Sequence, residues 1–531
     1  MRGLVLIRAI VPPRQHALRY KDRQDRPALI TARVLALATL ATAVAYLVWL
    51  YFHLNPYHPL MATAFMGAEI ICLLLFLAAT FTVWRLRYKP PEGLPVEEHS
   101  SVDVFITVCG EPLHVVQTTM DAARRITWLG PLTVHVLDDG ASDEVRALAH
   151  QYDIRYLSRP RSGLPPEHAK AGNLNFGLQR SDGAFILVLD ADQVPDPEIL
   201  FAMAGYMRFP DVGFIQSRQM FMVPENDPFF SLDRVFYEAV QLGYDHRDNA
   251  VSCGSGVLYR RAALSENGGF STWNVVEDLT TSYDLHSRGW RSFYYPHALS
   301  RGLAPFDVWG VYRQRSQWAL DTMRLFLWDN PFWKRGLRWA TRMSYGVIPL
   351  SYLSAGLVFP LFFVIPPWTY LTGGSVLAGN EVEFVVMRGL YFVTMALALR
   401  ALFRRHEAGK QFQMLVGLFP VYLVGTLRAF VYPRSRSPRY APNNTATTRR
   451  RRPAIVAVLP QLLLLAANAL LPFYAIIAAT APPRLILSNA LISAIAIWSL
   501  LPVVVAALGT PVWNESHSPN ALYGWTPETD R

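Results

Sequence analysis

Cysteine is scarce in this 531-residue chain, which contains only Cys72, Cys109 and Cys253. No two of them have the CxxC spacing, and they lie far apart, so neither a disulfide framework nor a cysteine-built zinc site organises the protein. Charged residues are also few, at 17%, against 52% hydrophobic residues. This composition is too apolar for an ordinary soluble enzyme and too polar for a protein embedded entirely in a membrane. It indicates a membrane protein with a substantial soluble domain.

Acidic residues are absent between Glu407 and Glu515, although the whole chain has 50 Lys and Arg against 40 Asp and Glu and a net charge of +10. Much of the basic excess therefore belongs to loops beside apolar segments. Membrane topology and attraction to anionic lipids explain this pattern better than nucleic-acid binding does. We expect the lipid bilayer as a partner, and no nucleic acid.

Long apolar runs predict the membrane spans, which are residues 34–54, 61–84, 346–371, 384–403, 454–479 and 485–508. Basic residues precede the first span and follow the second, which places both flanks in the cytosol. Residues 412–432 are apolar as well. A crossing there would put the following arginines outside, so we favour an interfacial or re-entrant helix, six spans and cytosolic termini. Residues 88–345 lack any run long enough to cross a bilayer and predict a cytosolic domain.

Within that domain, short apolar strands end in acidic pairs. The strand at 132–137 ends in Asp138 and Asp139, and the strand at 184–189 ends in Asp190-Ala191-Asp192. Strands that alternate with helices predict a mostly parallel sheet, in which ligands gather at the carboxyl ends of the strands. Alone, each pair is also typical of a solvated turn. Together they favour a site where Asp190 and Asp192 bind a hard divalent ion such as Mg²⁺ or Mn²⁺.

Three further segments carry polar groups suited to chemistry. Lys170 and Asn173 open a predicted helix and suit a phosphate or a nucleobase, although an ordinary capped helix start has the same pattern. Glu277 and Asp278 begin an amphipathic helix, where acidic residues often serve only the helix dipole. In the segment Arg313-Gln314-Arg315-Ser316-Gln317-Trp318, Gln314 and Trp318 are one helical turn apart and share a face, beside an interfacial aromatic stripe.

Taken together, the order and spacing of these motifs resemble the processive family 2 glycosyltransferases, in particular bacterial cellulose synthases. The family's aspartate pair, DxD, TED and QxxRW motifs correspond to Asp138-Asp139-Gly140, Asp190-Ala191-Asp192, Val276-Glu277-Asp278 and Gln314-Arg315-Ser316-Gln317-Trp318. Residues 170–173 look like its donor-binding segment, and Ser252-Cys253-Gly254-Ser255 looks like its FxCGS motif near the acceptor.

The resemblance implies roles for individual residues. Asp138, Asp139, Lys170, Asn173, Asp190, Gln314, Arg315 and Gln317 would bind the donor, with Asp139 at the uridine; Asp190 and Asp192 would bind Mg²⁺ or Mn²⁺; Asp278, beside Glu277, would be the general base; and Trp318, Cys253, Gly254 and Ser255 would contact the acceptor. Two positions depart from the family. Gln317 replaces an arginine that would contact the leaving group, and Val276 replaces the threonine of TED.

The resemblance also implies a domain order, with an α/β GT-A (Rossmann-like) domain inserted between transmembrane α-helices. We expect a basic cytosolic N-terminus (1–33), a transmembrane hairpin (34–87), the cytosolic GT-A domain (88–312), interfacial amphipathic helices (313–345), a second hairpin (346–403), an interfacial helix with a basic gating-like loop (404–453), a third hairpin (454–509) and a cytosolic tail (510–531).

The implied function is a multi-pass enzyme of the inner (plasma) membrane that polymerises a UDP-hexose, with UDP-glucose favoured, into a β-linked polysaccharide and translocates it. The UDP-sugar and the growing polysaccharide are the expected partners, and an accessory export subunit is left unidentified. A non-processive transferase that adds one sugar to a lipid carrier remains an alternative, as does a transporter or scaffold with a degenerate transferase domain. Glu69, inside the second span, either lines a polysaccharide channel or pairs with Arg388.

Overall fold

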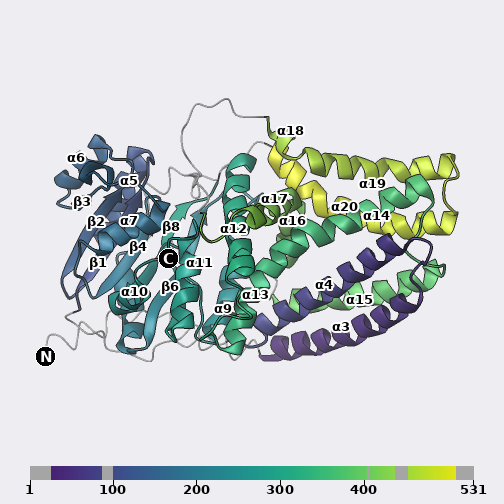
Figure 1. Cartoon of the computed structure of the whole chain (residues 1–531), viewed down its shortest axis with the longest axis horizontal. Coiled ribbons are helices and arrows are strands. Elements are labelled where there is room, and N and C mark those ends of the chain that lie inside the picture. Colours follow the sequence, from purple (N-terminus) through teal and green to yellow (C-terminus); the bar gives the residue numbers. More distant parts are fainter. Residues whose placement is uncertain (1–25, 87–99, 306, 404–406, 437–452, 510–531) are drawn as a thin grey trace.

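A sheet domain and a set of long helices make up the protein (Figure 1). The computed structural model describes residues 26–86, 100–305, 307–403, 407–436 and 453–509. The strands are β1 (Val102–Val108), β2 (Leu132–Asp138), β3 (Arg155–Leu157), β4 (Phe185–Asp190), β5 (Val194–Pro195), β6 (Val212–Met222), β7 (Val257–Arg260) and β8 (Arg291–Leu303). The domain's helices are α5 (Leu113–Arg124), α6 (Asp143–Gln151), α7 (Ala169–Leu178), α8 (Ile199–Ala204), α9 (Gln241–Asp245), α10 (Arg261–Asn267) and α11 (Glu277–Ser287).

The eight strands form one mixed sheet in the order β3-β2-β1-β4-β7-β6-β8-β5. Strands β3, β2, β1 and β4 are parallel neighbours, whereas β7 runs antiparallel to β4 and β6. The register pairs Val108 of β1 with Asp138 of β2, and Thr107 of β1 with Asp190 of β4. The two acidic strand ends therefore lie on either side of the end of β1, at the same edge of the sheet, as the sequence predicts.

Alternating apolar side chains give the sheet a hydrophobic core on each face. Val104 and Ile106 of β1 pack into one core with residues of α5, α6 and α8. Phe105 points to the opposite face, where residues of α7, α10 and α11 complete the second core. A period of two in the strands thus produces three layers, helix on sheet on helix. This arrangement confirms the predicted α/β fold.

Six helices among the described residues are long and apolar enough to cross a membrane. They are α3 (Arg26–Phe52), α4 (Pro59–Val83), the continuous stretch Trp339–Thr372 that contains α13 (Trp339–Leu353) and α14 (Phe359–Thr372), α15 (Glu381–Leu402), α19 (Leu459–Ile477) and α20 (Pro483–Leu508). The third of these begins seven residues before the predicted start at 346. The described chain has the helices of a multi-pass membrane protein.

The segment that the sequence left between an interfacial and a re-entrant helix forms two short helices, α16 (Ala408–Gly417) and α17 (Phe419–Val431), with a bend of 57° between them. Counted as one broken span, the pair would make seven crossings. Neither helix alone is long enough to cross the hydrocarbon core, because an α-helix rises ~1.5 Å per residue. In the expected basic gating-like loop, Tyr440 and the stretch 445–449 lie outside the described residues.

Helix α12 (Val308–Trp328) lies between the sheet domain and the long helices and crosses them steeply (Figure 1). Trp328, Trp333 and Trp339, at and after its C-terminal end, are exposed, as tryptophans at a membrane interface are. Nearby, the Arg33 guanidinium of α3 donates to the Trp84 carbonyl, and Arg247 donates to the Thr82 carbonyl at the end of α4. The basic ends of the first hairpin therefore lie on the side of the sheet domain.

The intramembrane carboxylate Glu69 of α4 is fully buried and pairs with Arg388 of α15, whose Nε lies 2.8 Å from Glu69 Oε1. The Tyr46 hydroxyl of α3 donates to the same oxygen at 3.2 Å. Four phenylalanine rings lie within 5.5 Å of the Arg388 guanidinium. Of the two alternatives that the sequence left open, the structure confirms the ion pair with Arg388.

Loss of one member of this pair should destabilise the protein strongly, because it leaves a buried charge without its partner. We expect Glu69→Gln to lower the free energy of unfolding by about 3–5 kcal/mol, the range for breaking a buried ion pair. The double variant Glu69→Gln/Arg388→Met should recover most of that loss. Thermal unfolding of the detergent-solubilised protein measures both; equal melting temperatures for wild type and the single variant would contradict the expectation.

Candidate active site

The two adjacent aspartates at the end of β2 have different hydrogen-bond partners. Asp138 is fully buried, and its carboxylate accepts hydrogen bonds from the Gly140 and Ser142 amides and from the Tyr156 hydroxyl, each at 2.8 Å. These three donors use the carboxylate to shape the turn after β2. Asp138, which the sequence assigned to donor binding, therefore lies beneath the site surface and fixes the orientation of Asp139.

Asp139 pairs with Arg159 through two parallel hydrogen bonds, from Nε to Oδ1 at 2.9 Å and from Nη2 to Oδ2 at 2.5 Å. Arg159 also donates to the Ala169 carbonyl and so joins the β2 turn to the start of α7. Sequence reasoning missed Arg159. It follows a three-residue strand and belongs to no motif, and only the parallel pairing of β3 with β2 brings it to this edge.

Lys170, at the start of α7, is the centre of the site. Its ammonium Nζ lies 2.6 Å from Asp190 Oδ1 and 3.4 Å from Glu277 Oε1, and donates to the Gly254 carbonyl at 2.7 Å. Burial alone would lower the pKa of Lys170. The carboxylates of Asp190, Glu277 and Asp278 outweigh that effect and hold the pKa above its usual range. One fixed positive charge therefore contacts side chains of β4 and α11 and a backbone carbonyl of the loop before β7.

Asp278 lies in the first turn of α11, with Oδ1 accepting the Leu279 amide at 2.6 Å. Burial, and then the negative charge of Glu277, raise the pKa of Asp278 to about 8, although Lys170 opposes the shift. Burial likewise raises the pKa of Glu277. A carboxyl group that changes its protonation state near neutral pH is suited to take a proton from a hydroxyl group.

The loop before β7, which contains Cys253, Gly254 and Ser255, is held rigidly beside these acids. The Ser255 hydroxyl accepts the Asp190 amide at 2.9 Å. The side chain of Gln216 accepts a hydrogen bond from the Cys253 amide and donates one to the Ser255 carbonyl. The side chain of Gln219 donates to the carbonyls of Cys253 and Ser255. Burial raises the pKa of the Cys253 thiol, so this thiol is protonated and unsuited to be a nucleophile. Gln216 and Gln219 are supporting residues to which the sequence motifs assigned no role.

Beyond Lys170, three acidic residues, Glu111, Asp190 and Asp192, are close enough to influence one another's charge. Burial, followed by the charges of Asp190 and Glu111, raises the pKa of Asp192 to about 7. Burial also raises the pKa of Glu111, which accepts the Cys109 amide at 2.6 Å and which the sequence did not single out. Within the described ranges, however, no three His, Cys, Asp or Glu side chains are arranged to hold a metal unaided. Oxygen ligands from a substrate would have to complete such a site.

Asn173 has a structural position in this fold. Its Nδ2 donates to the Leu137 carbonyl at 2.7 Å, and the side chain is buried. This bond ties α7 to β2 one turn after Lys170. It thereby fixes the direction in which the Lys170 side chain leaves the helix.

The Gln314–Trp318 segment lies on α12, and its arginine belongs to a second network. Arg315 Nη2 lies 2.8 Å from Asp233 Oδ2, and the guanidinium stands over the Trp318 ring, 4.7 Å from its centroid. Near Arg315, Tyr352 and Tyr422 stack on each other with ring centroids 5.0 Å apart. The structure thus brings Lys170 into contact with Asp190, Gly254 and Glu277. Asp278 lies beside them, and Arg315 and Trp318 belong to the network around Asp233.

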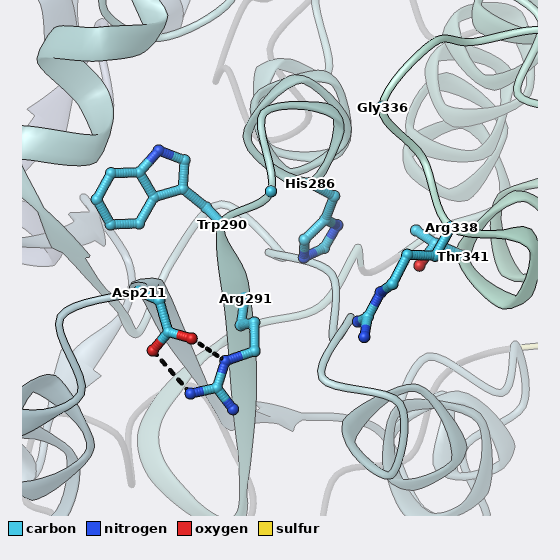
Figure 2. Close-up of a pocket in the computed structure, with 8 residues that line it drawn as sticks. Asp211, His286, Trp290, Arg291, Gly336, Arg338 and Thr341 are labelled. Atoms are coloured by element: carbon cyan, nitrogen blue, oxygen red, sulfur yellow. Dashed lines mark hydrogen bonds and ion pairs between the residues drawn. The ribbon is translucent and has the colours of Figure 1, made fainter.

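A pocket of about 170 Å³ lies away from these acids, where the C-terminal end of α11 meets the start of α13 (Figure 2). Its polar lining is engaged within the protein. Arg291 makes a two-pronged ion pair with Asp211, and the His286 ring nitrogens lie 2.8 Å from the Tyr345 hydroxyl and 2.9 Å from Ser292 Oγ. Burial, and then Arg338, lower the pKa of His286 to about 3, so the ring stays neutral. We assign this pocket a structural role.

Comparison with known proteins agrees with the fold. The family model described as "Glycosyl transferase family group 2" matches residues 185–403, from β4 through α15. Residues 185–403 therefore match a glycosyltransferase domain of this group, and the mixed sheet has the GT-A fold. The matched range contains Asp190, Asp278 and Trp318, whereas Asp139 and Lys170 precede it.

Curated relatives similar to the chain include cellulose synthases. It is 33% identical over 330 residues to cellulose synthase 1 of Komagataeibacter xylinus, covering 60% of this chain and 21% of that protein. It is 35% identical over 301 residues to the cellulose synthase catalytic subunit (UDP-forming) of Xanthomonas axonopodis pv. citri, covering 54% and 40%. The corresponding subunit of Pseudomonas fluorescens is 34% identical over 324 residues, with 58% and 43% covered. The chain matches less than half the length of each of these relatives.

Among solved structures, the mannosyltransferase PcManGT from Pyrobaculum calidifontis, in complex with GDP-Man and Mn²⁺, is similar to this chain with a TM-score of 0.48 and 15% identity. It covers 75% of this chain and 99% of its own. The sheet order and the family match, rather than this similarity, identify the fold.

Gly254 should be intolerant of any side chain because of its neighbours. Its φ is +80°, and an added Cβ would lie 2.9 Å from Asp278 Oδ2 and 3.1 Å from Lys170 Nζ. We expect Gly254→Ala to reduce transferase turnover ~100-fold, since displacing a reacting group by ~1 Å has such effects. Gly268→Ala is the matched control, with the same φ of +80° and no atom within 4 Å of the added Cβ.

Both alanine variants should lose about 1–2 kcal/mol of stability from the left-handed backbone, and only Gly254→Ala should lose activity. Thermal unfolding and initial rates of nucleotide release measure the two effects separately. Equal activity in the two variants would show that the contact between Gly254 and Asp278 is unimportant.

Proposed function

We propose that this protein is a processive, inverting glycosyltransferase that polymerises a UDP-hexose, with UDP-glucose as the proposed donor, into a β-linked polysaccharide and moves the product across the membrane. The arrangement of Asp278 carries the proposal. A carboxyl group with a raised pKa lies beside Lys170 and Asp190, at the edge where the sheet exposes its other acids. The cellulose synthase-like sequence supports the polymerising activity.

In the proposed reaction, Asp278 removes the proton from the acceptor hydroxyl as that oxygen attacks the anomeric carbon from the face opposite the leaving UDP. A single displacement inverts the anomeric configuration and needs one base, which fits Asp278 better than Glu277. Glu277 is nearly buried and faces Lys170, so it keeps that ammonium charged and in place. The carbonyl of Gly254 orients the same ammonium.

The diphosphate of the donor would lie against positive charge at this edge. Lys170 is the nearest cation to Asp190, and a phosphate oxygen can replace one of its carboxylate contacts. Asp139 would contact the uridine, with Arg159 fixing its direction.

Helix α12 would face the leaving group with Gln314, Arg315 and Gln317. Arg315 would first have to exchange its contact with Asp233. Trp318 would stack on the terminal acceptor sugar.

Asp190 and Asp192 would hold Mg²⁺ or Mn²⁺, with Glu111 close by. Burial, and then repulsion by Asp190 and Glu111, raise the pKa of Asp192. A divalent cation would relieve that repulsion, and carboxylate oxygens are the ligands it prefers. When bound, the ion would neutralise charge on the departing diphosphate. The choice between the two metals remains part of the proposal.

For the orientation, we propose that the sheet domain is cytosolic in the plasma (inner) membrane. Arg33 and Arg85, at the ends of the first hairpin, lie on the side of the sheet domain, where the positive-inside rule places them in the cytosol. UDP-sugars are made in that compartment. The domain boundaries given in the sequence analysis belong to this proposal as well.

The test is incubation of the purified full chain with a panel of UDP-sugars and Mg²⁺ or Mn²⁺, followed by gel analysis and digestion with linkage-specific hydrolases. We expect UDP release and a long, β-linked product from one sugar. Asp278→Asn should bind UDP as the wild type does and make at least ~100-fold less polymer, a typical contribution of a general base. A product one sugar long would favour transfer to a lipid carrier. An Asp278→Asn variant that retains substantial synthesis would remove the assigned base.

The pH dependence gives a separate prediction. Asp278 must be deprotonated to act, so kcat/KM should rise with pH and level off above the raised pKa of about 8. The charge of Glu277 contributes to that raised pKa, so Glu277→Gln should move the rising limb to lower pH. Lys170→Met should move it to higher pH, because Lys170 lowers the pKa of Asp278. Rates measured across pH 5–10 check both directions; shifts of the same sign in both variants would contradict this arrangement.

A further inference from the structure

Arg324 of α12 has no exposed surface, yet it makes five hydrogen bonds to three separate segments. Its guanidinium donates to Asn274 Oδ1 at 2.6 Å, to Asp321 Oδ1 at 3.1 Å, and to the carbonyls of Tyr432, Pro433 and Arg436 at 3.0, 3.2 and 3.0 Å. Asn274 belongs to the segment before α11, and Asp321 to α12 itself. Tyr432, Pro433 and Arg436 belong to the segment after α17. A side chain with one plane and fixed donor directions therefore connects the domain to the end of a helix near the membrane.

Asp321, one turn earlier on α12, holds the segment before α11 directly. Its Oδ2 accepts the Val275 and Val276 amides at 2.6 and 2.8 Å, and its backbone carbonyl accepts Asn274 Nδ2 at 3.2 Å. Val276 is followed immediately by Glu277 and Asp278. The first turn of α11 therefore begins from a backbone that is anchored to α12 at three points.

Trp273 strengthens the same connection. The guanidinium of Arg324 lies 5.4 Å from its ring centroid, and that of Arg434, from the segment after α17, lies 5.0 Å from it. Arg434 also approaches Asp329 of α12 at 3.4 Å. Two independent contacts thus join residues 432–436 to the chain just ahead of Asp278.

The energetics indicate that this network serves geometry rather than stability. Removing two charges from water costs several kcal/mol per ion, and a buried ion pair typically contributes little net stability compared with apolar residues of the same volume. Asp321 and Arg324 instead fix the positions of the segments that they contact. Their fixed acceptors and donors specify where residues 274–276 and 432–436 lie relative to α12.

We infer that Asp321 and Arg324 are positioning residues for Asp278, and that they make the placement of this base depend on the position of the segment after α17. The inference rests on the proposed function, in which Asp278 is the base. Because Arg324 contacts both segments, residues 432–436 cannot move away from α12 without releasing three of its hydrogen bonds. The guanidinium would then be left buried with unpaired donors, next to the backbone that carries Asp278.

The experiment compares Arg324→Lys with Arg260→Lys in the purified full chain. Arg260 is a matched control, since it donates to the carbonyls of Met207, Phe209 and Val212 and lies at the opposite end of β7 from Gly254. In both variants lysine keeps the positive charge but lacks the several fixed donors of the planar guanidinium group. Both variants should therefore lose thermal stability. Only Arg324→Lys should lose kcat, by ~10–100-fold, with the dissociation constant for UDP within about 2-fold of wild type.

Asn274→Ala provides a milder variant that keeps the argument testable if Arg324→Lys does not fold. It removes one acceptor of Arg324 and the Nδ2 donor to the Asp321 carbonyl, and it leaves the Asp321–Arg324 ion pair intact. We therefore expect kcat to fall and UDP binding to persist. A kcat in Asn274→Ala and Arg324→Lys no lower than in Arg260→Lys would overturn the inference. A wild-type protein that releases no UDP from any sugar of the panel would instead refute the proposed function, so the two failures are distinguishable.

Discussion

The ammonium of Lys170 is the interaction on which the site depends. Carboxylates from the end of β4 and the first turn of α11 approach the same ammonium and would repel one another without it. One cation placed between them, 2.6 Å from Asp190 and 3.4 Å from Glu277, allows them to share a single edge of the sheet. The rest of the site is arranged around that cation: Asn173 fixes the helix that carries it, and Gly254 has no side chain to obstruct it.

The acidic edge was predictable because it follows from periodicity. Apolar strands that end in aspartate, separated by helices, require parallel strands, and parallel strands bring their carboxyl ends together. The distinct roles of Asp138 and Asp139 were not predictable, because adjacent residues in a turn point in directions set by local hydrogen bonds. For a related reason, the sequence did not reveal the contributions of Arg159, Glu111 and Gln216 to the site. Each is brought to the site by the path of a loop or by strand pairing, and no spacing in the sequence encodes that path.

Paired charges show the same limit on the membrane side. The sequence identified Glu69 as exceptional and named Arg388 as one partner, yet it could not choose between a pair and a channel wall, because that choice depends on which helices are neighbours. In the structure, α3, α4 and α15 pack together and bury the pair among aromatic rings. Likewise, Arg315 lies in a motif that suggests a ligand contact. Only the fold shows that its guanidinium already forms an ion pair with Asp233.

Helix α12 joins these two halves of the protein. A polymerising enzyme must keep the end of its product aligned with its base while the product itself moves, so the groups that bind the acceptor and hold the base should belong to one rigid element. Trp318 and the Asp321–Arg324 pair lie on successive turns of the same helix, the first among the aromatic residues near the membrane and the second against the backbone before Asp278. A rigid helix keeps such distances constant. The geometry of α12 therefore supplies the alignment that repeated transfer requires in the proposed reaction.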